Sequence, residues 1–315
     1  MAASGLIADF LNLTSVLPVL FLFVTILFYF HIPLYYGVIQ GFKNFYRLGL
    51  AQVLWGFSRA ALAACIVLFL TKDLTVLFVG ILAATMITVY VSRQFAYEIR
   101  AHPAEHIERG ELIRAYSLIV PVVLMLVCVT VMKNIDVVFA RKFFDSSAAD
   151  AYACAALVGS GFFMLSGIFM VLFPVVSEEN TRGGNPIIFL VKSFQIIIGF
   201  SVIGLCVAWF APSVVMKIIT LGKYIPGAES LIRLVGVAVM PVSLVYIISH
   251  YLLAKHQWRF IPVLFCGMII QLLFIGIMHP SPLRMLEGVA IANWLTFIGM
   301  CLFVVFDHKG LLKHS

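Results

Sequence analysis

Nine apolar stretches constrain this chain more than any other feature of its sequence. A membrane-spanning helix needs about 20 mostly apolar residues, and the 315-residue sequence contains nine segments that meet or approach this length. A further short apolar segment at 214–221 is expected to lie at the membrane interface. The sequence therefore predicts an all-α, polytopic integral membrane protein of about nine transmembrane helices, at approximately 11–34, 48–70, 75–95, 112–132, 149–176, 187–210, 227–253, 260–278 and 288–306.

The composition excludes an ordinary globular domain. Hydrophobic residues make up 63% of the chain and charged residues only 11%, and the mean hydropathy is +1.10. The formal net charge is +7, but the basic residues are scattered at the ends of apolar stretches and form no patch or stripe of the kind that binds nucleic acid. Basic residues beside membrane spans account for this charge, so we expect no nucleic-acid partner.

The chain carries few signals of enzyme chemistry. Its six cysteines all lie within apolar runs, without CxxC spacing, which favours buried hydrophobic residues over disulfides or metal ligands. The sequence contains no P-loop, no aspartate-rich motif for a metal-bound pyrophosphate, and no paired His and carboxylate within a predicted helix. We therefore expect no enzyme activity, no catalytic residue and no cofactor or metal.

The most polar stretch of the chain divides the predicted helices into two groups. Residues 97–110 are rich in charges and contain Pro103, so we expect them to form a cytoplasmic connector. Residues 1–96 contain three predicted helices and residues 111–315 contain six. The first group is expected to be a partial N-terminal lobe and the second a complete C-terminal lobe.

Positive charges in the loops predict the orientation. Alternate connections carry 12 Lys and Arg on one side and 8 on the other, and the cytoplasmic side holds the excess, so we expect a cytoplasmic C-terminus. The first ten residues contain neither Lys nor Arg. The turn at 40–45 resembles that at 254–260, which follows the fourth of six predicted helices. A chain that lacks three helices at its start would explain both features.

Polar side chains at helical spacing inside an apolar segment face a partner or a hydrated cavity. Gln52, Trp55 and Arg59 share one face of a predicted helix, and Arg59 lies near its middle, where an uncompensated guanidinium is costly. Arg59 is therefore the strongest candidate for lining a hydrated cavity, with a structural partner as the alternative. The stripe of Thr85, Thr88 and Ser92 is instead expected to satisfy its own helix backbone.

Other charged residues are weaker candidates. Lys192 lies near the start of a predicted helix, where it could simply extend to the interface, and Arg233 lies about six residues into another. Asp136 is expected just beyond the helix that ends near residue 132, at the outer interface. There it would either form a structural ion pair with Lys133 or Arg141 or contribute to function.

Small residues and prolines indicate where the predicted helices pack closely and where they are interrupted. Ala151, Ala155 and Gly159 recur every four residues, a spacing that lets two helices approach closely, and packing is the favoured interpretation. Prolines are expected to interrupt four of the predicted helices, with the freed carbonyls satisfied by neighbouring helices or water. They are Pro18, Pro121, Pro174 and Pro241.

One segment resembles a known family. It contains Asn134-Ile135-Asp136-Val137-Val138, then Arg141-Lys142-Phe143-Phe144, then Ala149-Asp150-Ala151-Tyr152-Ala153, and finally Leu172-Phe173-Pro174. This order is similar to the seventh-to-eighth helix segment of polysaccharide exporters and oligosaccharide flippases, within the multidrug, oligosaccharidyl-lipid and polysaccharide exporter superfamily. The turns near Gln40 and Lys255 look like the family's turns after its fourth and tenth helices. Ala151 departs from the Gly that usually precedes the Tyr.

The resemblance implies two six-helix lobes around a cavity that opens alternately to each side. Such a protein moves lipid-linked oligosaccharide across a bacterial cytoplasmic membrane, with membrane lipid and polysaccharide assembly proteins as partners. Cationic residues would suit the pyrophosphate headgroup of that substrate. The candidate substrate-binding residues are Arg59, Arg233, Lys192, Gln52, Asp136 and Arg141.

Three alternatives stay open. A cation-coupled multidrug exporter of the same superfamily would need buried carboxylates, and only Asp136 lies near a predicted span. A polymerase or ligase of cell-envelope polysaccharide assembly would usually show a large polar outer loop, whereas the longest polar loop here is the predicted cytoplasmic connector. An inactive, truncated product is the third alternative.

Overall fold

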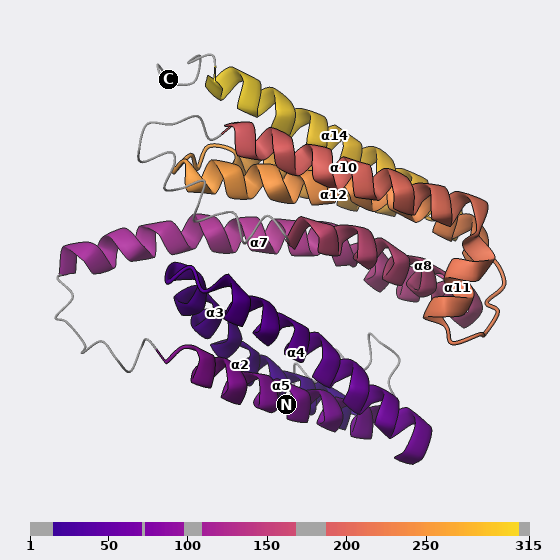
Figure 1. Ribbon diagram of the computed structural model, residues 1–315. Helices are drawn as coiled ribbons and strands as arrows, with labels where there is room; N and C mark the ends of the chain where they lie inside the picture. The colour runs from indigo at the N-terminus through magenta and orange to yellow at the C-terminus, as the bar shows by residue number, and fades with distance from the viewer. Residues whose placement is uncertain (1–14, 71–72, 98–108, 168–186, 309–315) are drawn as a thin grey trace. The chain divides into compact units, whose positions relative to one another are not determined.

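The structure is a computed structural model that describes residues 15–70, 73–97, 109–167 and 187–308 (Figure 1). Every regular element in these ranges is helical. In chain order they are α2 (Leu17–Tyr29), α3 (His31–Gly41), α4 (Phe45–Cys65), the π-helical segment η1 (Ile66–Leu70), α5 (Leu74–Phe95), α7 (Arg109–Phe143), α8 (Ser146–Met164), the 3₁₀ turn η2 (Leu165–Gly167), α10 (Ile187–Phe210), α11 (Pro212–Ile219), α12 (Ala228–Ala254), α13 (Ile261–Ile277) and α14 (Pro282–His308).

The helices have the length and composition that membrane spans require. Among the described residues, eight helices are long and apolar enough to cross a bilayer, with α2 and α3 counted as one and η1 counted with α4. A further apolar helix, α13, has 17 residues. These helices confirm the prediction of an all-α, polytopic membrane protein. The bounds of α10 coincide with the predicted 187–210.

The largest error in the predicted boundaries concerns α7. This helix has 35 residues and continues to Phe143, whereas an end near residue 132 was expected. The polar residues that suggested an end are compatible with a helix, because Asn134 Nδ2 donates a hydrogen bond to Thr130 O one turn earlier, at 2.9 Å. Lys133 and Asp136 therefore lie inside the apolar helix Ile119–Phe143 and not beyond its end.

The prolines interrupt fewer helices than expected. Pro18 lies in the first turn of α2, where a missing N–H leaves no intrahelical bond unmade, so the expected interruption there is wrong. Helices α7 and α12 continue through Pro121 and Pro241. Pro174 and most of the predicted connector at 97–110 lie outside the described residues.

The contact pattern divides the chain into unit 1, residues 1–106, and unit 2, residues 107–315. In unit 1, α5 packs against α2, α3 and α4. Asn44 caps α4 by accepting a hydrogen bond from Arg47 N at 3.3 Å. The Arg47 side chain then ties the start of α4 to the end of α5, because it donates to Phe95 O at 3.5 Å and lies 4.4 Å from the Tyr97 ring centroid.

In unit 2, α12 is the central helix and packs against α8, α10 and α14 (Figure 1). Its buried apolar residues belong to two separate clusters. Core A contains those between 240 and 254 together with Met125 of α7, and core B contains those between 228 and 238 together with Ala140 of α7. The two cores meet at the turn of α12 that contains Pro241.

Small residues bring α8 and α12 into close contact. Ala151 and Ala155 are buried, and a Cβ added to Gly159 would lie 2.9 Å from side-chain atoms of both Val235 and Val239 on α12. The predicted packing role of this ridge is therefore confirmed.

Candidate functional site

Three helices of unit 1 surround a cavity of about 160 Å³, here called the Arg59 cavity. Helix α2 contributes one wall, α4 contributes Trp55 and Arg59, and α5 contributes Ile81 and Thr85. The lining residues are Leu22, Thr25, Ile26, Tyr29, Trp55, Arg59, Ile81 and Thr85.

Aromatic rings hold the guanidinium of Arg59 in place. Trp55 precedes Arg59 by one helical turn, so the two side chains lie on the same face of α4. The Arg59 guanidinium carbon lies 4.8 Å from the Trp55 ring centroid, and the Tyr29 ring lies 5.9 Å from the same indole. This cation–π contact stabilises the positive charge by about 0.5 to 2 kcal/mol. The Arg59 side chain is itself exposed in the described structure.

The charge of Arg59 has no carboxylate counterpart within its own helices. Arg59 lies near the middle of the 26-residue apolar helix Phe45–Leu70, and residues 17–70 and 74–95 contain neither Asp nor Glu. Asp73 precedes α5 and accepts a hydrogen bond from Thr75 N at 2.7 Å, as an N-cap. The described helices of unit 1 thus place a guanidinium near the middle of an apolar helix, and none of them contributes a carboxylate to neutralise it.

Two of the remaining polar groups of the cavity, the threonine hydroxyls, donate hydrogen bonds to protein, and a third, the indole N–H of Trp55, does not. Thr25 and Thr85 donate their hydroxyls to Phe21 O at 2.7 Å and Ile81 O at 2.8 Å, so they satisfy their own helices. The indole Nε1 of Trp55 is buried without a protein acceptor. Arg59 and Trp55 therefore give the cavity N–H donors for an acceptor that the described protein atoms do not supply.

The other polar residues that were predicted to share a helix face either bond their own helix backbone, as expected, or lie outside the Arg59 cavity. Thr88 donates to Ala84 O at 2.9 Å, which, with Thr85, confirms the expectation for two of the three polar residues on α5. Gln52 is exposed on α4 and does not line the Arg59 cavity. Of the two residues predicted to share a face with Arg59, Trp55 therefore contacts it and lines the same cavity, and Gln52 does not line that cavity.

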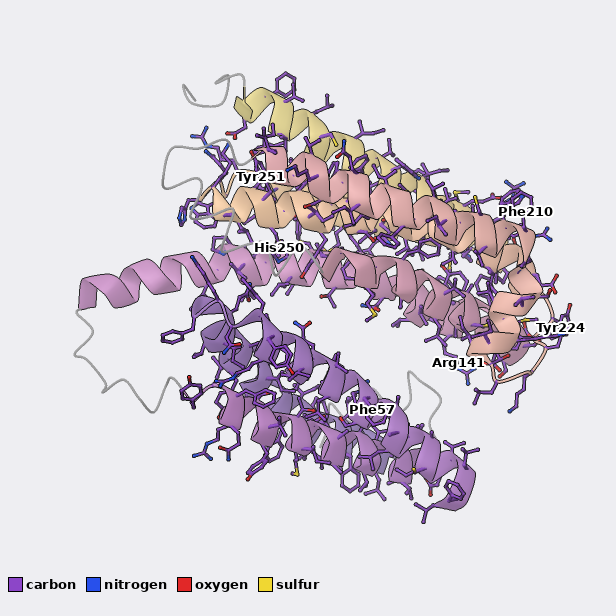
Figure 2. The ribbon with its side chains drawn as sticks, viewed as in Figure 1. Phe57, Arg141, Phe210, Tyr224, His250 and Tyr251 are labelled. Carbon is purple, nitrogen blue, oxygen red and sulfur yellow. The ribbon has the colours of Figure 1, made fainter. Side chains whose placement is uncertain are left out.

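The predicted cations of unit 2 lie apart from one another. Lys192 on α10 and Arg233 on α12 are both exposed. Arg141 is also exposed, near the end of α7 (Figure 2), and it donates a hydrogen bond to Ser146 Oγ at 3.3 Å. The structure does not bring these three residues together in either described pocket.

Asp136 occupies a different environment from the one predicted. It is 8% exposed, and its Oδ2 accepts a hydrogen bond from the Tyr152 hydroxyl at 2.8 Å. In the described structure no ion pair joins Asp136 to Lys133 or Arg141. Lys133 instead directs its ammonium over the Phe163 ring, 4.6 Å from the centroid. The expected position beyond the end of the helix is wrong, because α7 continues to Phe143 and the Asp136 carboxylate lies inside the bundle.

Two buried amides escaped notice in the sequence. Gln271 and Asn293 are 0% and 1% exposed, and each donates one hydrogen bond to a backbone carbonyl of another helix, namely Met132 O on α7 and Ala238 O on α12, both at 2.8 Å. Their one available signal was a single amide within a long apolar run. Asp136, Gln271 and Asn293 each retain one buried oxygen without a protein partner.

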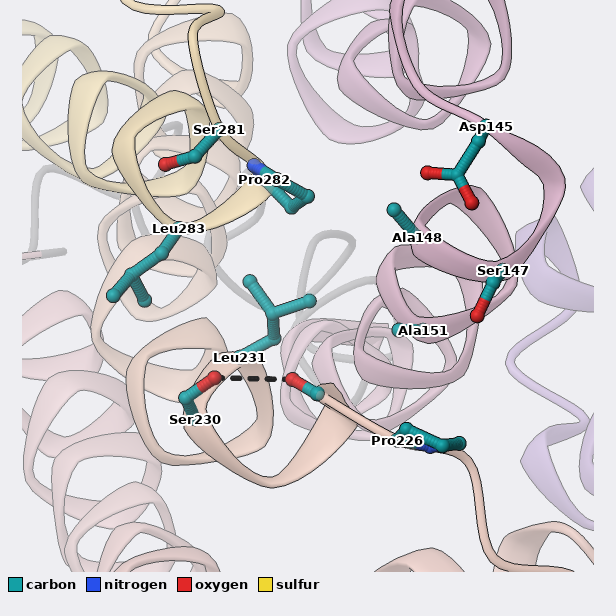
Figure 3. Close-up of a pocket in the computed structure, with 11 residues that line it drawn as sticks. Asp145, Ser147, Ala148, Ala151, Pro226, Ser230, Leu231, Ser281, Pro282 and Leu283 are labelled. Carbon is teal, nitrogen blue, oxygen red and sulfur yellow. Dashed lines mark hydrogen bonds between the residues drawn. The ribbon is translucent and has the colours of Figure 1, made fainter.

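A second pocket, of about 310 Å³, lies at one end of unit 2. The α7–α8 turn and the starts of α12 and α14 line it (Figure 3). Its polar groups include the Asp145 carboxylate and Ser230, which donates to Gly227 O at 3.0 Å. The lining residues include no Lys, Arg or His, so this end pocket is poorly suited to an anionic headgroup.

The described residues contain no group of three or more His, Cys, Asp or Glu placed to hold a metal ion. Of the two described pockets, the Arg59 cavity is the one that offers a positive charge and an unused N–H donor. Comparison with known proteins found no matching protein family, no similar curated protein and no similar solved structure.

Proposed function

We propose that the protein is a polysaccharide exporter of the oligosaccharide-flippase type. It moves a lipid-linked oligosaccharide from the cytoplasmic to the outer leaflet of the cell membrane, by alternating access and with its C-terminus in the cytoplasm. The observation that carries this proposal is the Arg59 cavity, where a guanidinium lies at mid-depth beside Trp55. The resemblance of the Asn134–Pro174 segment to such exporters gives independent support.

The chemistry of the cavity favours a phosphate group as the bound species. Arg59 can donate two parallel hydrogen bonds to phosphate oxygens, and such charge-assisted pairs are about twice as strong as neutral ones. The unused Trp55 Nε1–H can serve another oxygen of the same group. A neutral sugar hydroxyl would leave the guanidinium charge uncompensated.

The size of the cavity limits what it can hold. About 160 Å³ is smaller than the roughly 300 to 1,000 Å³ typical of sites for drug-sized ligands. The cavity therefore suits the phosphate portion of a substrate, with the glycan and the lipid chain outside it. This limit favours a flippase of headgroup-recognised lipids over a multidrug exporter.

Transport of a defined lipid tests the proposal. The purified protein is reconstituted in liposomes with a fluorescent polyprenyl diphosphate oligosaccharide, and the rate of exchange between leaflets is measured. We expect Arg59→Ala to lower the rate at least tenfold, because truncation removes the phosphate contact. Arg59→Lys should retain part of the rate, because it keeps the charge but loses the bidentate geometry.

The control variant is Arg93→Ala, which removes an exposed cation from the last turn of α5 and should transport at the wild-type rate. Equal and full activity of Arg59→Ala and Arg59→Lys would contradict the assignment of Arg59. Equal exchange of an uncharged fluorescent lipid would show nonspecific lipid scrambling and would overturn the proposed function.

A further inference from the structure

A short helix at one end of unit 2 connects two of the long helices. Helix α11 begins at Pro212, directly after α10 ends at Phe210, and the turn that follows it leads into α12 (Figure 1). Its eight residues make about 12 Å of helix, which is too short to cross a bilayer. Residues 209–224, which contain α11 and its flanks, are here called the α11 segment.

The inner face of α11 is fixed to the bundle. The helix packs against α8, α10 and α12. Met216 is fully buried in core B, and Val215 and Ile219 pack against the same core. Beyond the helix, Ile225 N lies 3.4 Å from Met216 Sδ. These contacts determine which side chains of α11 point away from the protein.

The outer face of α11 is apolar and exposed. Val214, Ile218 and Leu221 follow one another at intervals of four and three residues, so they lie on the same side of the helix, and all three are exposed. The aromatic residues that flank the helix are exposed as well, and they are Trp209, Phe210 and Tyr224 (Figure 2). Aromatic rings beside a short helix with an exposed apolar face are typical of a helix that lies in the membrane interface.

The backbone of Leu221 favours a different residue. Its φ angle is +55°, and Gly222 N donates to Lys217 O at 2.7 Å across it. This geometry is that of a Schellman cap, in which the left-handed residue is usually glycine, because a side chain is unfavourable there. Leu221 is 89% exposed, so contacts with the protein do little to offset that cost. Acyl chains outside the protein are a contact that would offset it.

Two lysines lie beside this apolar face. Lys217 and Lys223 are both exposed, and neither forms an ion pair within the described residues. The α11 segment contains neither Asp nor Glu, so its formal charge is positive. Lysine can bury its carbon chain along apolar surface while its ammonium reaches the headgroups, and basic residues at that level attract anionic lipids.

We propose that the α11 segment binds anionic phospholipid of the surrounding bilayer. Ile218 and Leu221 contact the acyl chains, and Lys217 and Lys223 pair with the lipid phosphates. The unpaired positive charges favour an anionic lipid over a zwitterionic one, whose own cation already neutralises its phosphate. The surface lies in unit 2, apart from the Arg59 cavity of unit 1, and its lipid is a bound ligand and not the transported substrate. Lipid binding is measured without transport, so its outcome does not depend on the flippase proposal.

Native mass spectrometry of the purified protein in detergent tests the proposal. The protein is titrated with dioleoyl phosphatidylglycerol and, in parallel, with dioleoyl phosphatidylcholine, and the affinity for each lipid is determined. Each lysine near an anionic lipid is expected to contribute about fivefold to the affinity. Replacement of both, Lys217→Gln with Lys223→Gln, should therefore lower the affinity for phosphatidylglycerol about 25-fold and leave that for phosphatidylcholine unchanged. Lys217→Arg with Lys223→Arg keeps both charges and should keep the preference.

The matched control is Arg284→Gln. It removes a cation from the start of α14 that already pairs with Glu287 at 3.1 Å, so the affinity for phosphatidylglycerol should not change. Leu221→Gly tests the apolar contact. It relieves the backbone of the cap, so Tm in detergent should stay the same or rise, whereas the affinity for both lipids should fall measurably.

Three results would overturn the proposed surface. They are equal affinities of the wild-type protein for the two lipids, a preference that survives replacement of both lysines by Gln, and an equal loss of affinity in Arg284→Gln. Glycerol 3-phosphate carries a phosphate without acyl chains and should not displace the bound phosphatidylglycerol. Displacement by it would show a site for free phosphate and would refute the assignment to a lipid.

Discussion

Pro241, inside the continuous helix α12, gives the sharpest test of how this bundle is held together. Proline has no N–H, so Val237 O, four residues earlier on α12, has no intrahelical donor. Trp294 of α14 supplies one, since its Nε1 donates to Val237 O at 3.2 Å. Trp294→Phe removes this donor, while an aromatic ring remains next to Phe297, whose ring centroid lies 5.7 Å from that of Trp294.

The expected loss of stability follows from the free energy required to bury a carbonyl without a hydrogen-bond donor. Such a group costs about 1 to 3 kcal/mol, although interhelical hydrogen bonds measured in membranes average about 0.6 and reach about 1.7 kcal/mol. We therefore expect Trp294→Phe to lower the free energy of unfolding by about 1 to 2 kcal/mol. Part of any loss will come from the smaller ring, so a single variant cannot isolate the hydrogen bond.

A double-mutant cycle separates the two contributions. Pro241→Ala restores an N–H that can bond Val237 O within α12. In that background Trp294→Phe should cost about 1 kcal/mol less, because the ring loss remains and the unpaired carbonyl does not. The free energy of unfolding is measured by circular dichroism in mixed micelles titrated with SDS. Trp209→Phe, at a position 58% exposed on α10, should change it by less than about 0.5 kcal/mol. If Trp294→Phe costs the same in both backgrounds, within about 0.4 kcal/mol, the reasoning is wrong.

Two further predictions concern contacts between helices of unit 2. Gly236→Ala should lower the free energy of unfolding by about 1 to 3 kcal/mol, because the added Cβ would lie 2.6 Å from Leu205 and 2.9 Å from Phe162. The control Gly199→Ala has open space around the added Cβ. It should leave the free energy of unfolding unchanged or raise it slightly in the same SDS titration. Asp307→Asn should lower Tm measurably, because it removes the partner of Lys255, 3.1 Å away, from a carboxylate that is only 6% exposed; an unchanged Tm at low salt would show that this ion pair contributes nothing.

The sequence was sufficient for the membrane class and for most helix positions. Apolar runs of about 20 residues between charged turns leave few other folds, because backbone groups in lipid must be bonded within a helix or a closed barrel. The prediction failed where polarity was taken as the end of a helix. Between Lys133 and Arg141, α7 continues because its polar side chains find partners inside the bundle or along the helix itself.

The candidate sites were only partly accessible from the sequence. Arg59 was detectable because a single charge interrupts an apolar helix, but the cavity beside it needs α2 and α5, whose positions no local pattern supplies. Gln271 and Asn293 were missed because their partners are 139 and 55 residues away in the chain. A lone amide in a long apolar run carries no period and no motif, so only the packed structure identifies its role.

The two mid-depth charges of α7 explain why the sequence suggested an ion pair and why the structure lacks one. Lys133 and Asp136 are three residues apart, a spacing that allows side-chain pairing on a helix surface. Each, however, has a partner on α8: Phe163 lies under the ammonium and Tyr152 donates to the carboxylate. A cation–π contact with Phe163 and a hydrogen bond from the neutral Tyr152 hydroxyl hold the side chains apart without cancelling either charge. The packing of α8 against α7 therefore leaves the carboxylate with one oxygen, Oδ1, that is buried without a hydrogen-bond partner.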